Sequence, residues 1–243
     1  MANIYETRHL LDEYLLFHYG TRAQILPEGA PEGQAEALDF AARTVVENVT
    51  AAPRGRALDL GCAVGRSSFE LSRFCDEVTG IDFSHAFVEA AARLRETGEA
   101  ECRRHDEGHV FTPLTVRVPE GARPERVRFE QGDAMALRGD LGAFDLVHAA
   151  NLLCRLPEPA RLLARLPHLV NAGGQLVLTT PCTWLGEFTP PENWPSGPTL
   201  DWLREALGAH FTLDAVRDQP FLIRETARKF QWTRAQASVW TRR

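Results

Sequence analysis

The 243-residue sequence lacks long apolar runs and an excess of positive charge, and each absence narrows the functions open to it. No apolar run reaches the length of a membrane-spanning helix. The net charge of −6 argues against a nucleic-acid partner, because binding to phosphates requires a concentrated basic face. We therefore expect neither a membrane nor a nucleic acid as partner.

The cysteines lack the C-x-x-C spacing of a zinc or redox motif. They are five in number and widely spaced, which is typical of reduced thiols. The first residues lack the basic start and apolar core of a signal peptide, so we expect a cytoplasmic protein. Cys102, His105 and His109 have a spacing compatible with metal binding, but no fourth ligand is evident, and no metal site is predicted.

The most informative segment present is an apolar strand that breaks into a turn of small residues over 57–68. Such a turn lets backbone N–H groups approach a ligand closely, and an acid after the next strand, Asp82, can bind a ribose. Asp59 lies inside the pattern Asp-x-Gly-x-Ala-x-Gly that ends at Gly65. An acid there suits the ammonium of a methionine moiety and would repel a pyrophosphate. The sequence therefore favours S-adenosylmethionine (SAM) over NAD.

Alternating strand and helix patterns continue along the chain. After the first strand we expect helix 66–74, strand 77–82, helix 84–97, strand 127–131, strand 144–150, helix 158–170, strand 174–180, helix 199–208, strand 211–217 and strand 235–241. This order predicts an α/β, Rossmann-like class I methyltransferase fold with a seven-stranded, mostly parallel sheet and helices on both faces. The last strand is expected to be antiparallel at the sheet edge. A Rossmann-like domain that binds another nucleotide, or none, is the alternative.

The domain organisation follows from the same patterns. Helices are expected over 6–19 and 34–49, joined by a Pro- and Gly-rich linker at 27–33. Residues 1–55 then form an N-terminal helical lid, and residues 56–243 form a single SAM-binding core. The segment 98–126 interrupts the alternation as a small hairpin or an extended loop. If strand 211–217 is parallel, the loop 218–233 hangs over the active site.

Several segments resemble the methyltransferase part of ovothiol biosynthesis, the 4-mercaptohistidine (5-thiohistidine) N1-methyltransferase family. They are Tyr5-Glu6-Thr7, residues 12–20, 59–72, 80–85 and 220–232. The resemblance implies a stand-alone enzyme that transfers methyl from SAM to the ring nitrogen nearest the side-chain attachment (Nπ). The products would be ovothiol A and S-adenosylhomocysteine. It also suggests a functional link to a separate sulfoxide synthase, which installs sulfur on histidine.

The expected cofactor site draws on several strand ends and on the N-terminal helix. Its residues are Tyr14, Asp59, Gly61, Cys62, Ala63, Gly65, Asp82, Phe83, Ser84, Asp133, Ala134 and Asn151. Asp133 and Ala134 are assigned to the adenine, and Cys62 is interpreted as a small packing residue. Phe83 either flanks the adenine or belongs to the core. Asn151 either faces cofactor and substrate or caps a helix.

The substrate residues are expected in two outer segments. Arg224 and Lys229, with Arg228 as runner-up, are candidates for binding a carboxylate, against the alternative of solvated surface charges. Tyr14 and His18 share one helix face, and with Tyr19 they form either a lid over the substrate or ordinary packing. His18 and Asn151 are the catalytic candidates, with His18 as hydrogen-bond partner or proton acceptor. Methylation of another small molecule, or SAM binding by a non-catalytic partner subunit, is the alternative function.

Overall fold

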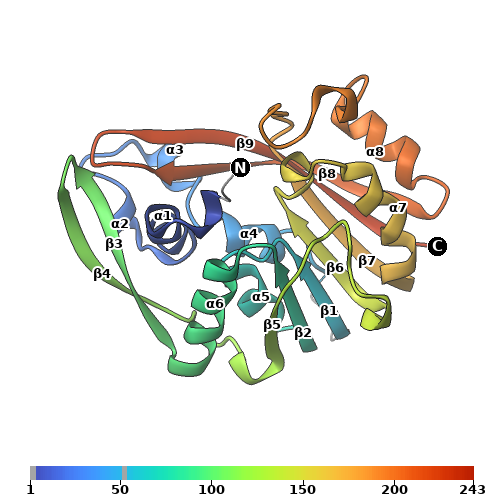
Figure 1. Ribbon diagram of the computed structural model, residues 1–243, viewed down its shortest axis with the longest axis horizontal. Helices are drawn as coiled ribbons and strands as arrows, with labels where there is room; N and C mark the ends of the chain where they lie inside the picture. The colour runs from blue at the N-terminus through green and yellow to red at the C-terminus, as the bar shows by residue number, and fades with distance from the viewer. Residues whose placement is uncertain (1–3, 51–53) are drawn as a thin grey trace.

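The computed structural model describes residues 4–50 and 54–243, and within them seven strands form one sheet in the order β5-β2-β1-β6-β7-β9-β8 (Figure 1). The parallel strands are β1 (Arg54–Leu60), β2 (Cys75–Asp82), β5 (Val127–Gln131), β6 (Phe144–Ala150) and β7 (Val170–Thr180). This confirms the predicted Rossmann-like fold. Parallel strands place all their carboxyl ends at one edge, where ligands of such sheets bind.

The C-terminal strands differ from the prediction in position and length. β9 (Phe230–Arg242) is antiparallel to β7, as expected, but it lies inside the sheet and not at its edge. The edge strand is β8 (Phe211–Arg224), which pairs with β9 from Phe211 to Arg224. The predicted loop 218–233 is therefore wrong: most of it is the far half of this hairpin, because backbone groups there pair across the two strands.

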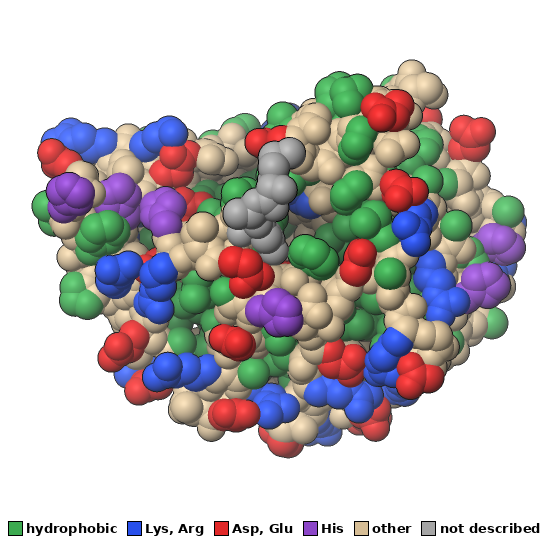
Figure 2. Space-filling view, viewed as in Figure 1, with side chains coloured by type: hydrophobic (Ala, Val, Ile, Leu, Met, Phe, Trp, Pro, Cys, Tyr) green, Lys and Arg blue, Asp and Glu red, His purple; other side chains and the backbone are tan. Residues whose placement is uncertain are grey.

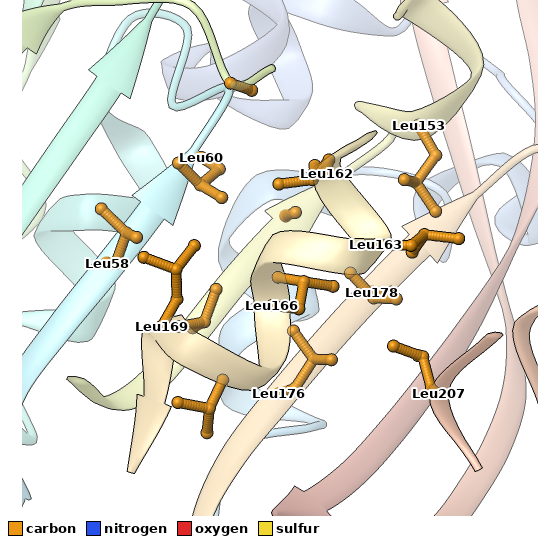
Figure 3. Close-up of a cluster of buried hydrophobic side chains, with 14 of the residues drawn as sticks. Leu58, Leu60, Leu153, Leu162, Leu163, Leu166, Leu169, Leu176, Leu178 and Leu207 are labelled. Atoms are coloured by element: carbon orange, nitrogen blue, oxygen red, sulfur yellow. The ribbon is translucent and has the colours of Figure 1, made fainter. Parts of the chain in front are cut away.

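One face of the sheet is covered by α7 (Pro159–Leu169) and α8 (Thr199–Leu207). Leucines of α7 recur at helical spacing, which places them on one side of the helix. They pack against leucines that alternate along the strands, as Figure 3 shows. The labelled side chains are Leu58, Leu60, Leu153, Leu162, Leu163, Leu166, Leu169, Leu176, Leu178 and Leu207. This cluster supports the strand ends of the candidate site from below.

The other face packs against α4 (Phe40–Val46), α5 (Arg66–Leu71) and α6 (His85–Thr97). Strand residues such as Val78 and Leu146 point to this face and meet Val45, Phe69 and Leu94 of the three helices. α6 begins where the Ser84 hydroxyl accepts a hydrogen bond from the N–H of Phe87, at 3.2 Å. The sheet thus carries helices on both faces, as predicted.

The N-terminal segment consists of η1 (Ile4–Glu6), α1 (Arg8–Tyr19), α2 (Arg22–Ile25) and α3 (Glu32–Ala35) before α4. The predicted helix 34–49 is divided into α3 and α4. Asp39, which precedes α4, has a left-handed backbone with φ of 54°, and such a residue breaks the helical path. Residues 1–3 and 51–53 of the predicted lid lie outside the described residues.

The segment 98–126 is a hairpin, one of the two predicted possibilities. β3 (Glu99–Glu107) and β4 (Val110–Arg117) form an antiparallel pair beside α1. In Figure 1 α1 lies between this hairpin and the far end of β8–β9. The N–H of Ala227 donates to the carbonyl of Asp106 at 2.9 Å, so the two hairpins are joined.

The connections between the other elements include four single 3-10 turns. They are η2 (Pro124–Arg126), η3 (Gly139–Leu141), η4 (Leu153–Arg155) and η5 (Pro191–Asn193).

Candidate functional site

The loop between β1 and α5 has the backbone of a close-approach turn. Gly61, Ala63 and Gly65 have φ of 69°, 46° and 87°, in the left-handed region. A Cβ added to Gly65 would lie 2.7 Å from Cζ of Phe129, so only glycine fits there. The loop can therefore present backbone N–H groups to a ligand, as the sequence pattern predicted.

Asp82, at the end of β2, is tied to this loop. Its Oδ2 accepts from the N–H of Ala63 and its Oδ1 from the N–H of Ser84, each at 2.9 Å. Burial raises the pKa of this carboxyl, and the hydrogen bonds from Ser84 and Ala63 partly offset that rise. The carboxyl is thus held at the junction of two strand ends, where we predicted contact with ribose hydroxyls.

Phe83 and Asp133 lie at neighbouring strand ends, because β2 pairs with β5. The Phe83 side chain is 59% exposed, which excludes the core alternative and leaves it available to flank a ligand. Oδ1 of Asp133 accepts from the N–H of Met135 at 2.8 Å, and Ala134 is 9% exposed beside it. The predicted adenine contacts are therefore adjacent in space.

Asp59 lies beneath the loop and is only 1% exposed. Its Oδ1 is 2.8 Å from Nδ1 of His148, and its Oδ2 accepts from the hydroxyl of Ser68 at 2.6 Å. The contact predicted between Asp59 and the methionine ammonium stays a prediction. In this structure both carboxylate oxygens have protein partners, so Asp59 supports the loop from below. Cys62 is fully buried beside it, in agreement with a packing role.

His148 was not singled out from the sequence. Its Nε2 lies 3.0 Å from Oγ1 of Thr44, which donates its own proton to the carbonyl of Ala41 at 2.9 Å. His148 thus joins Asp59 of β1 to Thr44 of α4 through its two ring nitrogens. The available signal was a histidine within the apolar run Leu146–Ala150 of β6.

α1 is fastened to the same loop. The hydroxyl of Tyr19 donates to the carbonyl of Val64 at 2.8 Å, and Nη1 of Arg66 donates to the carbonyl of His18 at 2.9 Å. Rings of Tyr14 and His18 lie 5.7 Å apart, which confirms that they share one helix face. The predicted N-terminal residues therefore lie directly over the cofactor loop.

His18 is 7% exposed, and its Nδ1 is buried with no hydrogen-bond partner among residues 4–50 and 54–243. Burial, assisted by the charge of Arg66, lowers the pKa of His18 to about 3. The ring is therefore neutral near pH 7 and a poor proton acceptor. Its unpaired nitrogen can instead form a hydrogen bond with a ligand beside the loop.

The 3-10 turn η1 docks where α6 begins, an arrangement not predicted from the sequence. The carbonyl of Tyr5 accepts from the Ser84 hydroxyl at 2.9 Å. The carboxylate of Glu6 accepts from the N–H groups of His85 at 2.9 Å and Ala86 at 3.1 Å. A carboxylate at the start of a helix is stabilising. The Tyr5–Glu6 dipeptide is therefore anchored beside Asp82.

Asn151 follows β6 with a left-handed φ of 53°. Its Oδ1 accepts from the hydroxyl of Thr179 at 3.1 Å, and its N–H donates to the Thr179 carbonyl at 2.9 Å. The residue that precedes η4 is Leu152, so the helix-cap alternative is wrong. Asn151 is instead held at the end of β6, facing the neighbouring end of β7.

The predicted carboxylate-binding residues lie elsewhere. Arg224 is 8% exposed and donates to the carbonyls of Gln24 and Ile25 and to Asp106. It joins α2 to both hairpins, which corrects the prediction of an arginine free in an overhanging loop. Arg228 and Lys229 lie in the turn between β8 and β9, both exposed, and Lys229 pairs with Glu225 at 2.6 Å.

Glu13 of α1 faces this turn and was not predicted. Burial raises the pKa of Glu13 to about 7, the charge of Glu225 adds to the rise, and Lys229 opposes it. A carboxyl that titrates near neutrality is therefore placed between α1 and the β8–β9 hairpin.

Neither a metal site nor a membrane span is found in the part of the chain that the structure describes. No group of three or more His, Cys, Asp or Glu residues there is arranged to hold a metal. Cys102 is 1% exposed, and the ring of His105 stacks on Phe111. No helix there has the length and apolar character needed to cross a membrane. On the face shown in Figure 2, acidic and basic side chains are interspersed.

Residues 33–233 match the family model of a methyltransferase domain. The chain is 29% identical over 148 residues to the trans-aconitate 2-methyltransferase of Deinococcus radiodurans, covering 60% of this chain and 45% of that protein. It is 25% identical over 187 residues to the demethylmenaquinone methyltransferase of Lactococcus lactis, covering 74% and 57%. The chain thus spans about half the length of the curated relatives it matches.

A similar solved structure is the N-methyltransferase NodS from Bradyrhizobium japonicum WM9 in complex with S-adenosylhomocysteine. It covers 96% of this chain and 98% of its own, with a TM-score of 0.54 and 12% identity, which shows a common fold. The left-handed loop over Gly61–Gly65 and the acid Asp82 fit a SAM-type cofactor at the corresponding strand ends. With a family match over most of its length and this sheet order, the chain belongs to the methyltransferase domain family of class I, SAM-dependent methyltransferases.

Proposed function

We propose that this chain is an N-methyltransferase that methylates Nπ of 5-thiohistidine, giving ovothiol A. The observation that carries the proposal is where the resembling segments lie. Segment 5–20 contacts segment 80–85 through Tyr5 and Ser84, and the rings of Phe17 and Phe221 lie 6.0 Å apart. Segments far apart in the sequence thus meet around α1, at the carboxyl end of the sheet. A shared acceptor would account for their joint presence.

The proposed methyl transfer does not require a general base from the protein. SAM supplies the methyl group, and its S–CH₃ bond breaks as the ring-nitrogen lone pair forms the new N–C bond. The thiolate of the acceptor balances the positive charge that develops on the ring, so no proton must leave through the protein. Residues of the site therefore act mainly by positioning and by excluding water.

His18 fits such a positioning role. It is neutral, and its buried Nδ1 has no partner within the described residues, so a ligand can supply one. We propose that His18 hydrogen-bonds the acceptor or the cofactor, and that Asn151, held by Thr179, borders the same space. The thiolate is the better intrinsic nucleophile, so these contacts would have to keep sulfur away from the methyl group.

The test is product identification by mass spectrometry. The purified protein is incubated with SAM and, separately, with 5-thiohistidine, histidine and ergothioneine, and fragmentation distinguishes N- from S-methylation. We expect an N-methylated product from 5-thiohistidine alone, and less of it with the Asp82→Ala variant when SAM is below saturation.

The second candidate is methylation of a different small molecule, which the similarity to two other small-molecule methyltransferases favours. It would be preferred if SAM binds and none of the three acceptors reacts. A functional link to a separate sulfoxide synthase belongs to the first proposal only, because that enzyme would supply the thiohistidine.

A further inference from the structure

Arg155 stands apart from the other arginines near the site. It ends η4, four residues beyond Asn151, at the carboxyl end of the parallel strands, and its N–H bonds the carbonyl of Leu152 at 2.8 Å. Arginines of the surrounding elements are each within ion-pair distance of a carboxylate. These are Arg66 and Arg73 with Glu70, Arg103 with Asp12, and Arg104 and Arg224 with Asp106.

The guanidinium of Arg155 is partly desolvated and incompletely satisfied. Its Cζ lies 4.4 Å above the centroid of the Phe188 ring, which holds the side chain in place. Nη1 is buried and has no hydrogen-bond partner among the residues that the structure describes. A buried guanidinium N–H without an acceptor is unfavourable, so an anionic ligand would be stabilised there.

Arg155 also faces the candidate site. The ring of Tyr5 lies 6.4 Å from Phe188 on one side and 5.7 Å from Phe87 of α6 on the other. Burial raises the pKa of Tyr5, while the charge of Arg155 and a side-chain hydrogen bond with it lower that pKa. Tyr5 therefore contacts Arg155 through its side chain and Ser84, two residues after Asp82, through its carbonyl.

We propose that Arg155 binds the carboxylate of the methyl acceptor, so that the acceptor is a small carboxylate such as an α-amino acid. A planar guanidinium suits a carboxylate because two parallel N–H donors can meet its two oxygens. The inference rests on the proposed function, and it replaces Arg224, which is paired with Asp106, with an arginine that has no ion-pair partner among the described residues. Asn151 and Arg155 then lie on one turn, which would fix the acceptor relative to the end of β6.

The experiment measures ligand binding to the protein saturated with S-adenosylhomocysteine by calorimetry. Two pairs of ligands differ only in the carboxylate: 5-thiohistidine with 5-thiohistamine, and histidine with histamine. We expect the wild-type protein to bind the carboxylate member about 10- to 100-fold more tightly. Arg155→Met should abolish that preference while leaving affinity for the decarboxylated member unchanged, and Arg155→Lys should restore part of it.

The matched control is Arg161→Met in α7, where the arginine is exposed and paired with Glu158, and it should leave every affinity unchanged. Equal weakening of acid and amine by Arg155→Met would indicate a structural role and overturn the inference. Weakened SAM binding would assign Arg155 to the cofactor carboxylate and overturn it too. If 5-thiohistidine is not methylated but the histidine pair shows the Arg155-dependent preference, the proposed function fails and this inference stands. If neither pair shows a preference, the inference fails.

Discussion

Nδ1 of His148 lies 2.8 Å from Oδ1 of Asp59, and the side chains are 0% and 1% exposed. With Ser68 on one side and Thr44 on the other, the pair links α5, β1, β6 and α4 beneath the cofactor loop. Because both side chains are buried and hydrogen-bonded to each other, removing either one leaves the other buried without its partner.

Replacing His148 with phenylalanine should therefore destabilise the protein strongly. Removing one member of a buried pair leaves the other without compensation and costs about 3–5 kcal/mol. The measurement is urea unfolding, with His168→Phe, an exposed site on α7, as the control expected to change little. The double variant Asp59→Leu/His148→Phe should be less destabilised than the sum of its single changes. A loss below about 1 kcal/mol for His148→Phe would contradict this account.

Gly65 and Gly98 provide a matched pair for the cofactor loop. Both have positive φ, of 87° and 79°, but a Cβ at Gly65 meets Phe129 at 2.7 Å whereas nothing lies within 4 Å at Gly98. Gly98→Ala should cost only the left-handed strain, about 1–2 kcal/mol of unfolding free energy. Gly65→Ala should cost more and should also weaken SAM binding. Equal effects on stability and unchanged SAM affinity in both variants would rule out the close-approach role of Gly65.

Asp82→Ala should weaken SAM binding by about 1–3 kcal/mol, as expected for the loss of charge-assisted hydrogen bonds to the ribose. The variant also frees the N–H of Ala63, so the loop itself loses a restraint. Calorimetry with SAM gives the affinity, and thermal unfolding without SAM separates the effect on the fold. Asp140→Ala, at a side chain that is 81% exposed, serves as the control. Unchanged affinity would remove Asp82 from the ribose role.

Glu13 and Glu225 should give opposite pH dependences. The folded-state pKa of Glu13, about 7, lies above its ordinary value of 4.5, so the folded protein holds that proton more tightly. The contribution of Glu13 to the stability of the folded protein is then fully present below pH 4.5 and is lost as the pH rises toward 7. Glu13→Gln should therefore gain stability over the wild type across this window and keep the gain above it.

Glu225 serves as the control, because its pKa is shifted in the opposite direction to that of Glu13. Its hydrogen bond from Lys229 holds the pKa of Glu225 below the ordinary value, so its contribution is present above that value and is lost in acid. Glu225→Gln should lose stability near neutrality and approach the wild type in acid. Urea unfolding at several pH values measures both, and parallel curves for all three proteins would contradict the assignment.

The features that could be predicted from the sequence are those set by residues close together in the chain, such as the turns that follow the strands. The strand ends at Gly61, Gly65 and Asp82 were found because each strand is followed by residues with a recognisable backbone preference. Partners far apart in the chain were not found. Asp59 and His148 are 89 residues apart, and their pairing depends on β1 lying beside β6.

The position of Arg224 was predicted wrongly because local sequence preference and long-range strand pairing disagree there. The segment 218–233 contains a proline and many charged or polar residues, which favours a loop on local grounds. Pairing with β9 overrides that preference and carries Arg224 to the carbonyls of α2. Arg155 gave no signal at all, because its unpaired nitrogen depends on which carboxylates fold away from it.

The hydrogen bond between Ala227 and Asp106 joins the β3–β4 hairpin to the β8–β9 hairpin. It closes a ring of two hairpins around α1, and the Tyr19 hydroxyl fastens the end of that helix to Val64. A helix enclosed in this way forms a fixed wall of the site. The short turn η1 is held to the start of α6 by the hydrogen bonds of Tyr5 and Glu6, and the ring of Tyr5 also packs against Tyr14 and Phe87. Backbone amides of α1 should accordingly exchange slowly with or without SAM, while those of η1 should respond to it.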